Sequence, residues 1–340
     1  MWTFVHTSVG LYLKHMIAFP ARELVCCSDK NRTELNSLGE LAKIWAFGSS
    51  AIRRRLSHWK PRSGGGENSR EQDHNRNDNI MAQTYSSYLK VNQLLELQEP
   101  LSDGPEHDEM LFIVIHQVYE LWFKQILHEA DRLKDLFSNG EGGRAQHTLG
   151  RIRSILKVMV SQLDVLETMT PLEFNSFRAR LETASGFQSF QFRELEFLLG
   201  LKSMEAVERF PSGSPARQRL KKRMEESCLW DFFLQFLRRR GYEFDANEKA
   251  VYEGKPGDPL TSVQRVLIDI YRNNSEVAQV AESLLDLDEG LQEWRYRHVK
   301  MVQRTIGMKM GSGGSTGVEY LRTTLDRPVF PDLWVIRSQF

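Results

Sequence analysis

Cysteine is nearly absent from this sequence. Its 340 residues contain only Cys26, Cys27 and Cys228, and no C-x-x-C or C-x-x-C-H spacing occurs. These absences exclude a zinc site built from paired cysteines and a haem attached covalently through cysteines. Low cysteine content is typical of proteins from reducing compartments, so we expect a cytoplasmic protein.

The sequence also lacks an excess of either charge and any long membrane-crossing apolar run. Lysine plus arginine and aspartate plus glutamate both number 45, so no overall field would attract nucleic acid or an anionic lipid surface. The N-terminal stretch "MWTFVHTSVGLYLKHMIAF" has little positive charge ahead of its apolar part, which Lys14 interrupts, so it is a poor signal peptide. We expect no nucleic-acid partner and no membrane partner.

Apolar residues are scarce between residues 48 and 80, where the sequence is first basic, then glycine-rich and then polar. Such a composition cannot bury enough apolar surface to fold, so it predicts a disordered linker. Residues 1–47 form an N-terminal extension of unknown role, with weak helical patterning around residues 35–47. We expect the folded domain to span residues 81–340, which is long enough for one large core.

Alternating strand patterns are nearly absent after residue 81, and helical periodicity takes their place. Apolar positions from Ile152 to Leu166 recur at i, i+3, i+4, i+7, i+11 and i+14, as on one face of a long amphipathic helix. Thr170, Pro171 and Glu173 then form a capping box that predicts a new helix. Further helical runs cover residues 190–201, 229–241, 259–272 and 275–310. The pattern predicts an all-α fold, a single large helical domain of eight or more helices.

One of the most apolar runs, "LFIVIHQVYELWFKQIL" at residues 111–127, has His116 near its centre. At 100° per residue, Phe112, His116, Glu120 and Phe123 share a face, with Tyr119 at its margin. The histidine is either a core residue whose ring has one hydrogen-bond partner, or a polar group that overhangs a buried pocket and bonds a ligand N–H or O–H. The residues alone leave both interpretations open.

A second histidine lies within another apolar stripe. This stripe has helical spacing and consists of Leu287, Leu291, Trp294, His298 and Met301. The basic residues around it take the remaining faces of the helix: Arg295, Arg297, Lys300 and Arg304. A neutral imidazole on a rigid apolar face suits an iron or haem ligand, because the ring must present an unprotonated nitrogen away from water. The alternative is again a core histidine.

Arg178 lies among four phenylalanines, which are Phe174, Phe177, Phe187 and Phe190. The side chain either extends from a core face to water or clamps a carboxylate bidentately inside an apolar pocket. The small residues of the nearby "ASGFQS" would permit a ligand to approach closely.

The stretch "GSGGSTG" at residues 311–317 is rich in glycine but lacks the lysine of a phosphate-binding loop. It is either a flexible helix terminator or a tight turn whose N–H and hydroxyl groups receive a charged ligand. Other catalytic motifs are missing: no G-x-S-x-G, H-E-x-x-H or G-x-G-x-x-G occurs. The only E-x-x-H, Glu71 with His74, lies in the expected linker and cannot form a di-iron bundle.

Five stretches together resemble the tryptophan 2,3-dioxygenase family, in order along residues 85–322. They are "YSSYLKVNQLLELQ", "HDEMLFIVIHQVYELWFKQILHE", "PLEFNSFRARLETASGFQS", "WRYRHVKMVQRTIG" and "GSGGSTGVEYLR". The resemblance implies an all-α fold with a buried, non-covalently bound haem b and its iron. It implies an enzyme that cleaves the indole C2–C3 bond of L-tryptophan with O2, giving N-formyl-L-kynurenine at the start of the kynurenine pathway. Residues before about Met81 have no counterpart in the family pattern.

The resemblance also implies roles for individual residues. His298 would be the haem iron's ligand, with Ser185 and Gly186 lining the haem, and His116 would be the catalytic residue that faces the indole N–H. Phe112 would pack on the indole, Arg178 would pair with the substrate carboxylate, and Ser312 would lie near its ammonium group. The family usually has threonine at Ser312, and some bacterial members have tyrosine at Phe174, so one methyl group and one hydroxyl contact are absent here.

The family resemblance further implies a homotetramer in which N-terminal helices reach a neighbouring subunit's site. Tyr85, Tyr88 and Leu89 would then line a pocket of another chain. Two alternatives remain: a related haem protein that oxidises another indole derivative, and a helical scaffold without cofactor in which each histidine is a core residue.

Overall fold

The computed structural model describes residues 83–104, 106–248, 260–311 and 317–340. The chain divides into two units, Met1–Ile80 and Met81–Phe340. The expectations for residues 1–80 lie outside the described residues. Within the described residues every regular element is an α-helix or a 3₁₀-helix, so the predicted all-α fold is confirmed. None of the described helices has both the length and the apolar content to cross a membrane.

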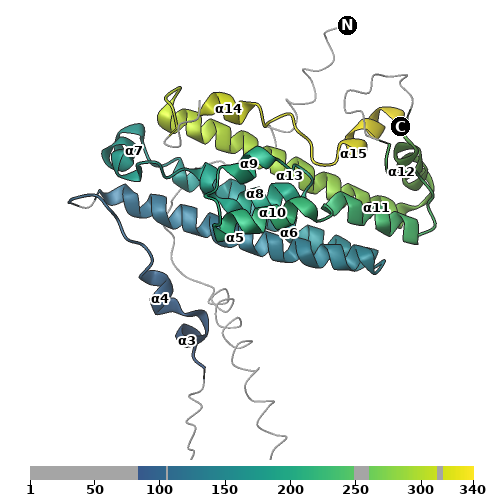
Figure 1. Ribbon diagram of the computed structural model, residues 1–340, viewed down its shortest axis with the longest axis horizontal. Helices are drawn as coiled ribbons and strands as arrows, with labels where there is room; N and C mark the ends of the chain where they lie inside the picture. Colours follow the sequence, from purple (N-terminus) through teal and green to yellow (C-terminus); the bar gives the residue numbers. More distant parts are fainter. Residues whose placement is uncertain (1–82, 105, 249–259, 312–316) are drawn as a thin grey trace, which may run out of the picture. The chain divides into compact units, whose positions relative to one another are not determined.

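Three long helices form the centre of the Met81–Phe340 unit (Figure 1). They are α5 (His107–Ser138), α6 (Gly142–Leu166) and α13 (Ser275–Ile306). Their apolar stripes meet in one core, in which Leu133, Met159 and Leu284 are fully buried. The stripe predicted from Ile152 to Leu166 is the core face of α6. Such burial stabilises the bundle by about 1.5–3 kcal/mol for each large apolar side chain.

Shorter helices cover the long ones. They are α7 (Pro171–Arg178), η1 (Ala179–Leu181), η2 (Gly186–Gln188), α8 (Phe190–Leu198), α9 (Met204–Glu208), α10 (Pro215–Glu225), α11 (Leu229–Arg239) and α12 (Ser262–Asn273). The capping box predicted for α7 is present: Thr170 accepts from the Glu173 N–H, and Glu173 accepts from the Thr170 N–H. This cap sets the start of the helix that carries Phe174 and Arg178 into the site.

The end of α13 differs from the sequence prediction. The helix stops at Ile306, not near Met310, because Gly307 has φ +60°. Residues without a Cβ adopt this left-handed region at little cost, so the glycine ends the helix.

The C-terminal segment lies along α13 and α12. It contains α14 (Val318–Arg322), α15 (Pro331–Val335) and η3 (Ile336–Gln339). The fully buried carboxylate of Asp288 on α13 accepts from the Val329 N–H at 2.8 Å and from the Phe330 N–H and the Trp334 indole N–H at 2.9 Å. Three donors satisfy the buried charge, so Asp288 anchors this segment against the helix.

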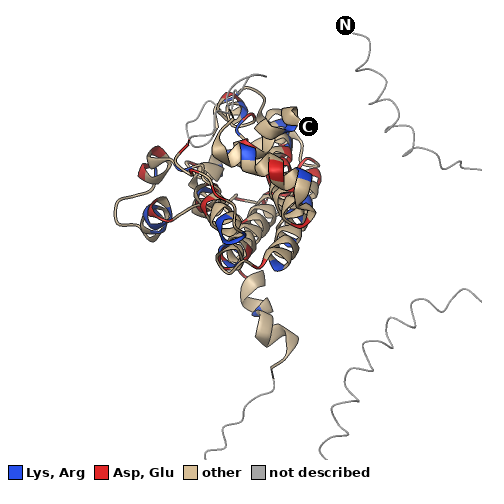
Figure 2. Ribbon diagram, turned by 90° about the vertical axis from the view of Figure 1, so that its right-hand side faces the viewer, with Lys and Arg blue, Asp and Glu red and all other residues tan. Residues whose placement is uncertain are grey.

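Two short helices at the start of the described chain stand off the bundle (Figure 1). They are α3 (Tyr85–Leu89) and α4 (Val91–Leu95), and neither has a buried residue. Residues 83–95 are called the arm below. Figure 2 shows the arm almost without charged residues, and Tyr85 and Tyr88 are 77% and 69% exposed. An apolar surface of this kind is typical of a segment that packs against another chain.

Candidate active site

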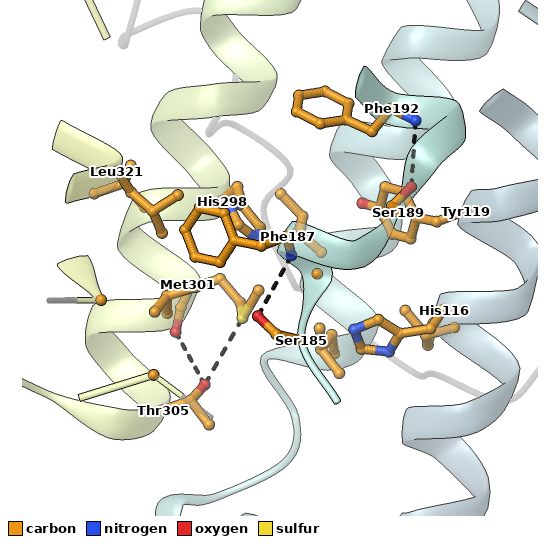
Figure 3. A pocket seen from close by; sticks show the side chains of 18 of the residues that line it. His116, Tyr119, Ser185, Phe187, Ser189, Phe192, His298, Met301, Thr305 and Leu321 are labelled. Carbon is orange, nitrogen blue, oxygen red and sulfur yellow. Dashed lines mark hydrogen bonds between the residues drawn. The ribbon is translucent and has the colours of Figure 1, made fainter. Parts of the chain in front are cut away.

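One cavity collects side chains from α5, α7, η2, α8, α13 and α14. Six of the ten residues to which the resemblance gives a site role line it: Phe112, His116, Arg178, Ser185, Gly186 and His298. Figure 3 shows His298 extending into the cavity from α13 and His116 from α5. These residues are as far as 186 positions apart in the chain, between Phe112 and His298, so packing of the helices brings them together.

His298 has no hydrogen bond to any described residue. Its ring stacks on Trp294, with centroids 5.3 Å apart and an interplanar angle of 12°. Burial, together with a smaller effect of the nearby His116, lowers the pKa of His298 to about 4. At neutral pH the imidazole is therefore uncharged, and its nitrogen lone pair remains available for a metal ion.

His116 is held differently. Its Nδ1 lies 2.7 Å from the Phe112 carbonyl oxygen. A carbonyl only accepts, so Nδ1 carries the proton and Nε2 is the unprotonated nitrogen. Burial lowers the pKa of His116, against the opposing effects of the Phe112 hydrogen bond and the Glu120 charge. The neutral ring can therefore accept a hydrogen bond from a ligand N–H in the cavity.

Aromatic rings form the wall next to His116. The Phe112 ring lies 4.0 Å from the His116 ring, 5.8 Å from Phe174 and 5.6 Å from Phe177, measured between centroids. Phe177 is fully buried and packs edge-on against Phe174. A rigid wall of this type suits a flat apolar ring such as an indole.

Arg178 enters the cavity from the last turn of α7. Its guanidinium donates to the Met310 carbonyl at 2.6 Å. A guanidinium has five N–H donors in a planar fork, so one bond to the backbone orients the group and leaves donors for a bidentate carboxylate. The cavity is therefore apolar near His116 and cationic near Arg178.

Ser185 and Gly186 form the turn before α8. The Ser185 hydroxyl accepts from the Phe187 N–H at 3.4 Å and caps η2. A Cβ added at Gly186 would meet no atom within 4 Å, because the backbone faces open space there. This arrangement lets a large flat group approach the backbone closely.

The residues of the cavity fit a haem. No group of three or more His, Cys, Asp or Glu that could hold a metal ion occurs among the described residues. An iron at His298 would therefore need ligands from a macrocycle. The neutral, stacked imidazole would supply one nitrogen ligand to the iron, and the open surface at Gly186 faces the same cavity.

Arg295 lies on α13 beside the apolar stripe of His298, as the sequence indicates, and it is buried there. Its guanidinium is buried and donates to Glu196 at 3.2 Å and to the carbonyl oxygens of Thr324 and Arg327 at 3.4 and 3.2 Å. The pKa of Arg295 is lowered by burial, which the charge of Glu196 partly opposes. The pair with Glu196 joins α13 to α8, and the two carbonyl contacts join α13 to the segment that follows α14. Sequence reasoning missed it because an arginine beside a charged helix face usually points to water.

Of the remaining predicted residues, the three that the structure describes do not line this cavity. Tyr85, Tyr88 and Leu89 are exposed on α3. Ser312 lies outside the described residues, although Gly311 and Gly317 at the two ends of that loop line the cavity. Sequence reasoning also did not assign Arg193, Glu196 and Tyr320, which line the cavity.

Comparisons with known proteins find relatives along most of this chain. The family model described as tryptophan 2,3-dioxygenase matches residues 68–248 and 259–340, and so begins within the segment interpreted as a linker. Among curated relatives, the tryptophan 2,3-dioxygenase of Herpetosiphon aurantiacus is 56% identical over 259 residues, covering 76% of this chain and 98% of that protein. The proteins of that name from Anaeromyxobacter sp. and Caulobacter vibrioides are 53% and 42% identical, covering 96% and 98% of their own lengths and 76% and 75% of this chain.

Proposed function

This chain belongs to the tryptophan 2,3-dioxygenase family, and we propose from that premise how its residues perform the reaction of the family. The protein is an oxidoreductase that cleaves the indole C2–C3 bond of L-tryptophan with O2, in the first step of tryptophan catabolism through the kynurenine pathway. Both oxygen atoms enter N-formyl-L-kynurenine, so the overall reaction balances without an external reductant.

One observation supports the proposal most strongly. A single cavity holds a neutral imidazole without a hydrogen-bond partner among the described residues, a second imidazole with one free acceptor nitrogen, and a guanidinium. The first imidazole suits iron ligation, the second suits recognition of an indole N–H, and the guanidinium suits recognition of a carboxylate. The stability of a helical scaffold would not require these three groups to line the same cavity.

The cofactor is haem b, bound without covalent attachment. His298 would hold its iron, while Ser185 and Gly186 would lie against the macrocycle. When bound, the haem supplies the oxygen chemistry that no protein side chain can perform. The apolar lining from Phe112 and Phe174, which the buried Phe177 packs against, excludes water from the reacting ring.

The substrate is held at its two ends. The Nε2 of His116 accepts a hydrogen bond from the indole N–H, and Phe112 packs against the ring. Arg178 pairs with the carboxylate, and Ser312 contributes a hydroxyl near the ammonium group. Holding the ring and the amino-acid group at once restricts the substrate to one orientation, which is how the protein contributes to the rate.

The working protein is a cytoplasmic homotetramer. The arm of each chain completes the site of a neighbour through Tyr85, Tyr88 and Leu89. The exposed, nearly uncharged surface of the arm supports this assembly, since two exposed tyrosines are apolar area that a monomer would leave in water.

An absorption time course tests the proposal. The haem-loaded, reduced protein is mixed with L-tryptophan in air, and the haem bands and the N-formylkynurenine band are followed together, with His298→Ala as control. We expect haem bands and product from the native chain. Haem bands with product only from another indole derivative would favour a different substrate, and a protein that binds no haem would favour the helical scaffold.

A further inference from the structure

The arm joins α5 through a short segment, residues 97–103, called the root below. No residue of α3 or α4 is buried. The internal packing of the arm therefore cannot determine where the arm points. Its direction depends on the bonds that hold the root to the bundle.

Glu109, in the first turn of α5, makes the central contact with the root. Its side chain is only 2% exposed. One carboxylate oxygen accepts from the Leu101 N–H at 2.8 Å, and the other accepts from the Ser102 N–H at 3.0 Å and from the Ser102 hydroxyl. Ser102 in turn accepts from the Glu106 N–H at 3.2 Å. The carboxylate thus holds two consecutive residues of the root at once.

The charge of this carboxylate is stabilised where it lies. Burial alone would raise the pKa of Glu109, but the hydrogen bonds from Ser102 and Leu101 and the charge of Arg180 hold that pKa below its ordinary value. Three hydrogen bonds to one buried anion form a short and rigid attachment, because charge-assisted bonds are stronger than neutral ones.

Two further contacts hold the ends of the root. The Gln117 side chain donates to the Leu97 carbonyl at 2.8 Å and accepts from Gln98 at 2.5 Å. Asp103 pairs with Arg180 at 2.8 Å. Gln117 follows His116 directly, and Arg180 lies two residues after Arg178. The root is therefore bonded beside residues of its own chain's cavity.

Glu109 also shares a helical stripe with two cavity residues. Glu109, Phe112 and His116 are spaced i, i+3 and i+7 along α5, so the root crosses the helix about one turn before Phe112. Glu109 itself does not line the cavity. No step of the reaction uses it, and helix formation alone does not need a buried carboxylate bonded to a loop.

We propose that Glu109, assisted by Gln117, is a positioning residue for the neighbouring subunit's active site: it holds the root so that Tyr85, Tyr88 and Leu89 reach the cavity of a second copy of this chain. The inference rests on the proposed homotetramer. Glu109 would thus affect substrate binding in the neighbouring subunit without touching that subunit's cavity.

The first test compares Glu109→Gln with Asp108→Asn in the full-length, haem-loaded protein. Both changes remove one negative charge from the same turn, but among the described residues Asp108 bonds to its neighbour His107 and makes no hydrogen bond or ion pair with the root. We expect Glu109→Gln to raise the KM for L-tryptophan by about tenfold or more, since a displacement of about 1 Å can cost on the order of 10²-fold. Haem content and the haem spectrum should stay unchanged, and Asp108→Asn should match the native chain.

A mixed oligomer shows on which chain Glu109 acts. Chains with Glu109→Gln keep an intact cavity, and chains with Arg178→Ala keep an intact root. Oligomers that contain both chains are isolated through two different tags. We expect some sites to regain the native KM, because arms from the Arg178→Ala chains serve the cavities of the Glu109→Gln chains. Mixed oligomers no better than Glu109→Gln alone would overturn the proposal.

Amide hydrogen exchange of residues 83–95 gives a readout that does not depend on activity. We expect the arm to be protected in the native oligomer and exposed in Glu109→Gln and in Gln117→Ala, while α5 and α13 remain protected. Gln117→Ala leaves no buried charge unpaired, so it serves if Glu109→Gln fails to fold. An active monomeric native chain would overturn this proposal and leave the function intact. A native tetramer that is inactive, but whose arm loses its amide protection in Glu109→Gln, would overturn the proposed function. It would leave the role of Glu109 in holding the arm.

Discussion

The helices α5 and α13 each have 32 residues and each direct one imidazole into the same cavity, yet the two rings have different chemistry. His298 on α13 stacks on Trp294 and has no hydrogen bond to a described residue. His116 on α5 donates a hydrogen bond through Nδ1 to the Phe112 carbonyl. The charge of Glu120 partly opposes the lowering of its pKa by burial. Both pKa values are lowered, so both rings are neutral near pH 7.

The difference shows that the surroundings, and not the residue type, assign the roles. A ring without a hydrogen-bond partner can give its lone pair to a metal ion, and flat stacking keeps it in place. A ring whose Nδ1 is already bonded has a defined tautomer, and its Nε2 can recognise a substrate N–H. The α13 side is therefore suited to the cofactor, and the α5 side to the substrate.

Removing the α13 imidazole should have the largest effect. We expect His298→Ala to lose nearly all bound haem, since even outer partners of a metal ligand cost about 10–100-fold in metal affinity when changed. The haem absorption of the loaded and desalted protein measures this loss. His116→Ala is the matched control and should keep its haem, and an unaltered haem spectrum in His298→Ala would contradict the division between the two helices.

Removing Arg178, the proposed partner of the substrate carboxylate, should have the second-largest effect. Arg178→Ala should raise the KM for L-tryptophan by about 10–100-fold, because a hydrogen bond to a charged group contributes about 1.5–3 kcal/mol. Haem content should change little, since the loss lies on the substrate side.

The clamp has a close control in Arg180→Ala, which removes a similar guanidinium two residues away, paired with Asp103 at the surface. It should change the KM less than Arg178→Ala does, because Arg180 pairs with Asp103 and not with the substrate, and Glu109 and Gln117 still hold the root. Equal losses of haem and of substrate affinity in Arg178→Ala would refute the clamp role.

The α5 imidazole should have a smaller effect. If His116 orients the indole N–H, His116→Gln should lower kcat/KM by about tenfold or less, as one neutral hydrogen bond contributes about 0.5–1.5 kcal/mol. A general base would contribute about 10²–10⁴-fold. A loss in that larger range would show that His116 removes a proton.

The pH dependence checks the same residue. Burial lowers the pKa of His116 below its ordinary value of 6.5, so the protonated ring, which cannot accept a hydrogen bond, forms only at lower pH. Activity should therefore persist down to pH 6.5 and fall only below it, and His116→Gln should lack this acid limb. A midpoint above pH 6.5 in the native protein would contradict the assignment.

The smallest effect should come from a helix cap. Thr170→Ala removes the cap of α7, which carries Phe174 and Arg178, and should cost about 1 kcal/mol of unfolding free energy in a urea titration. Ser203→Ala removes the cap of α9 and should cost a similar amount. Only Thr170→Ala should also raise the KM, and equal KM values in both variants would mean that this cap does not support the substrate side.

Much of the fold could be predicted from the sequence, because local rules apply to it. The spacing of Ile152 to Leu166 and the capping box at Thr170 depend only on helix geometry. The end of α13 was misplaced because a single glycine with positive φ stops the helix before its apolar pattern ends.

The site could be predicted in part. The two histidines and Arg178 stood out because each is a polar group in an apolar stretch. Arg295 did not stand out, since its partners Glu196, Thr324 and Arg327 come from distant segments. Glu109 did not stand out for another reason: its partners Leu101 and Ser102 are near in the chain, but an acidic residue in a first helical turn is expected to be solvated there.

The sequence by itself determined which segments are helical, which faces are apolar and where imidazoles interrupt them, since these properties follow from side chains a few residues apart. Only the tertiary structure decided what each interruption can do. The desolvation of both rings and the meeting of His116, Arg178 and His298 in one cavity depend on contacts between helices that lie far apart in the chain. Such contacts arise from packing of whole helices, and no local spacing encodes them.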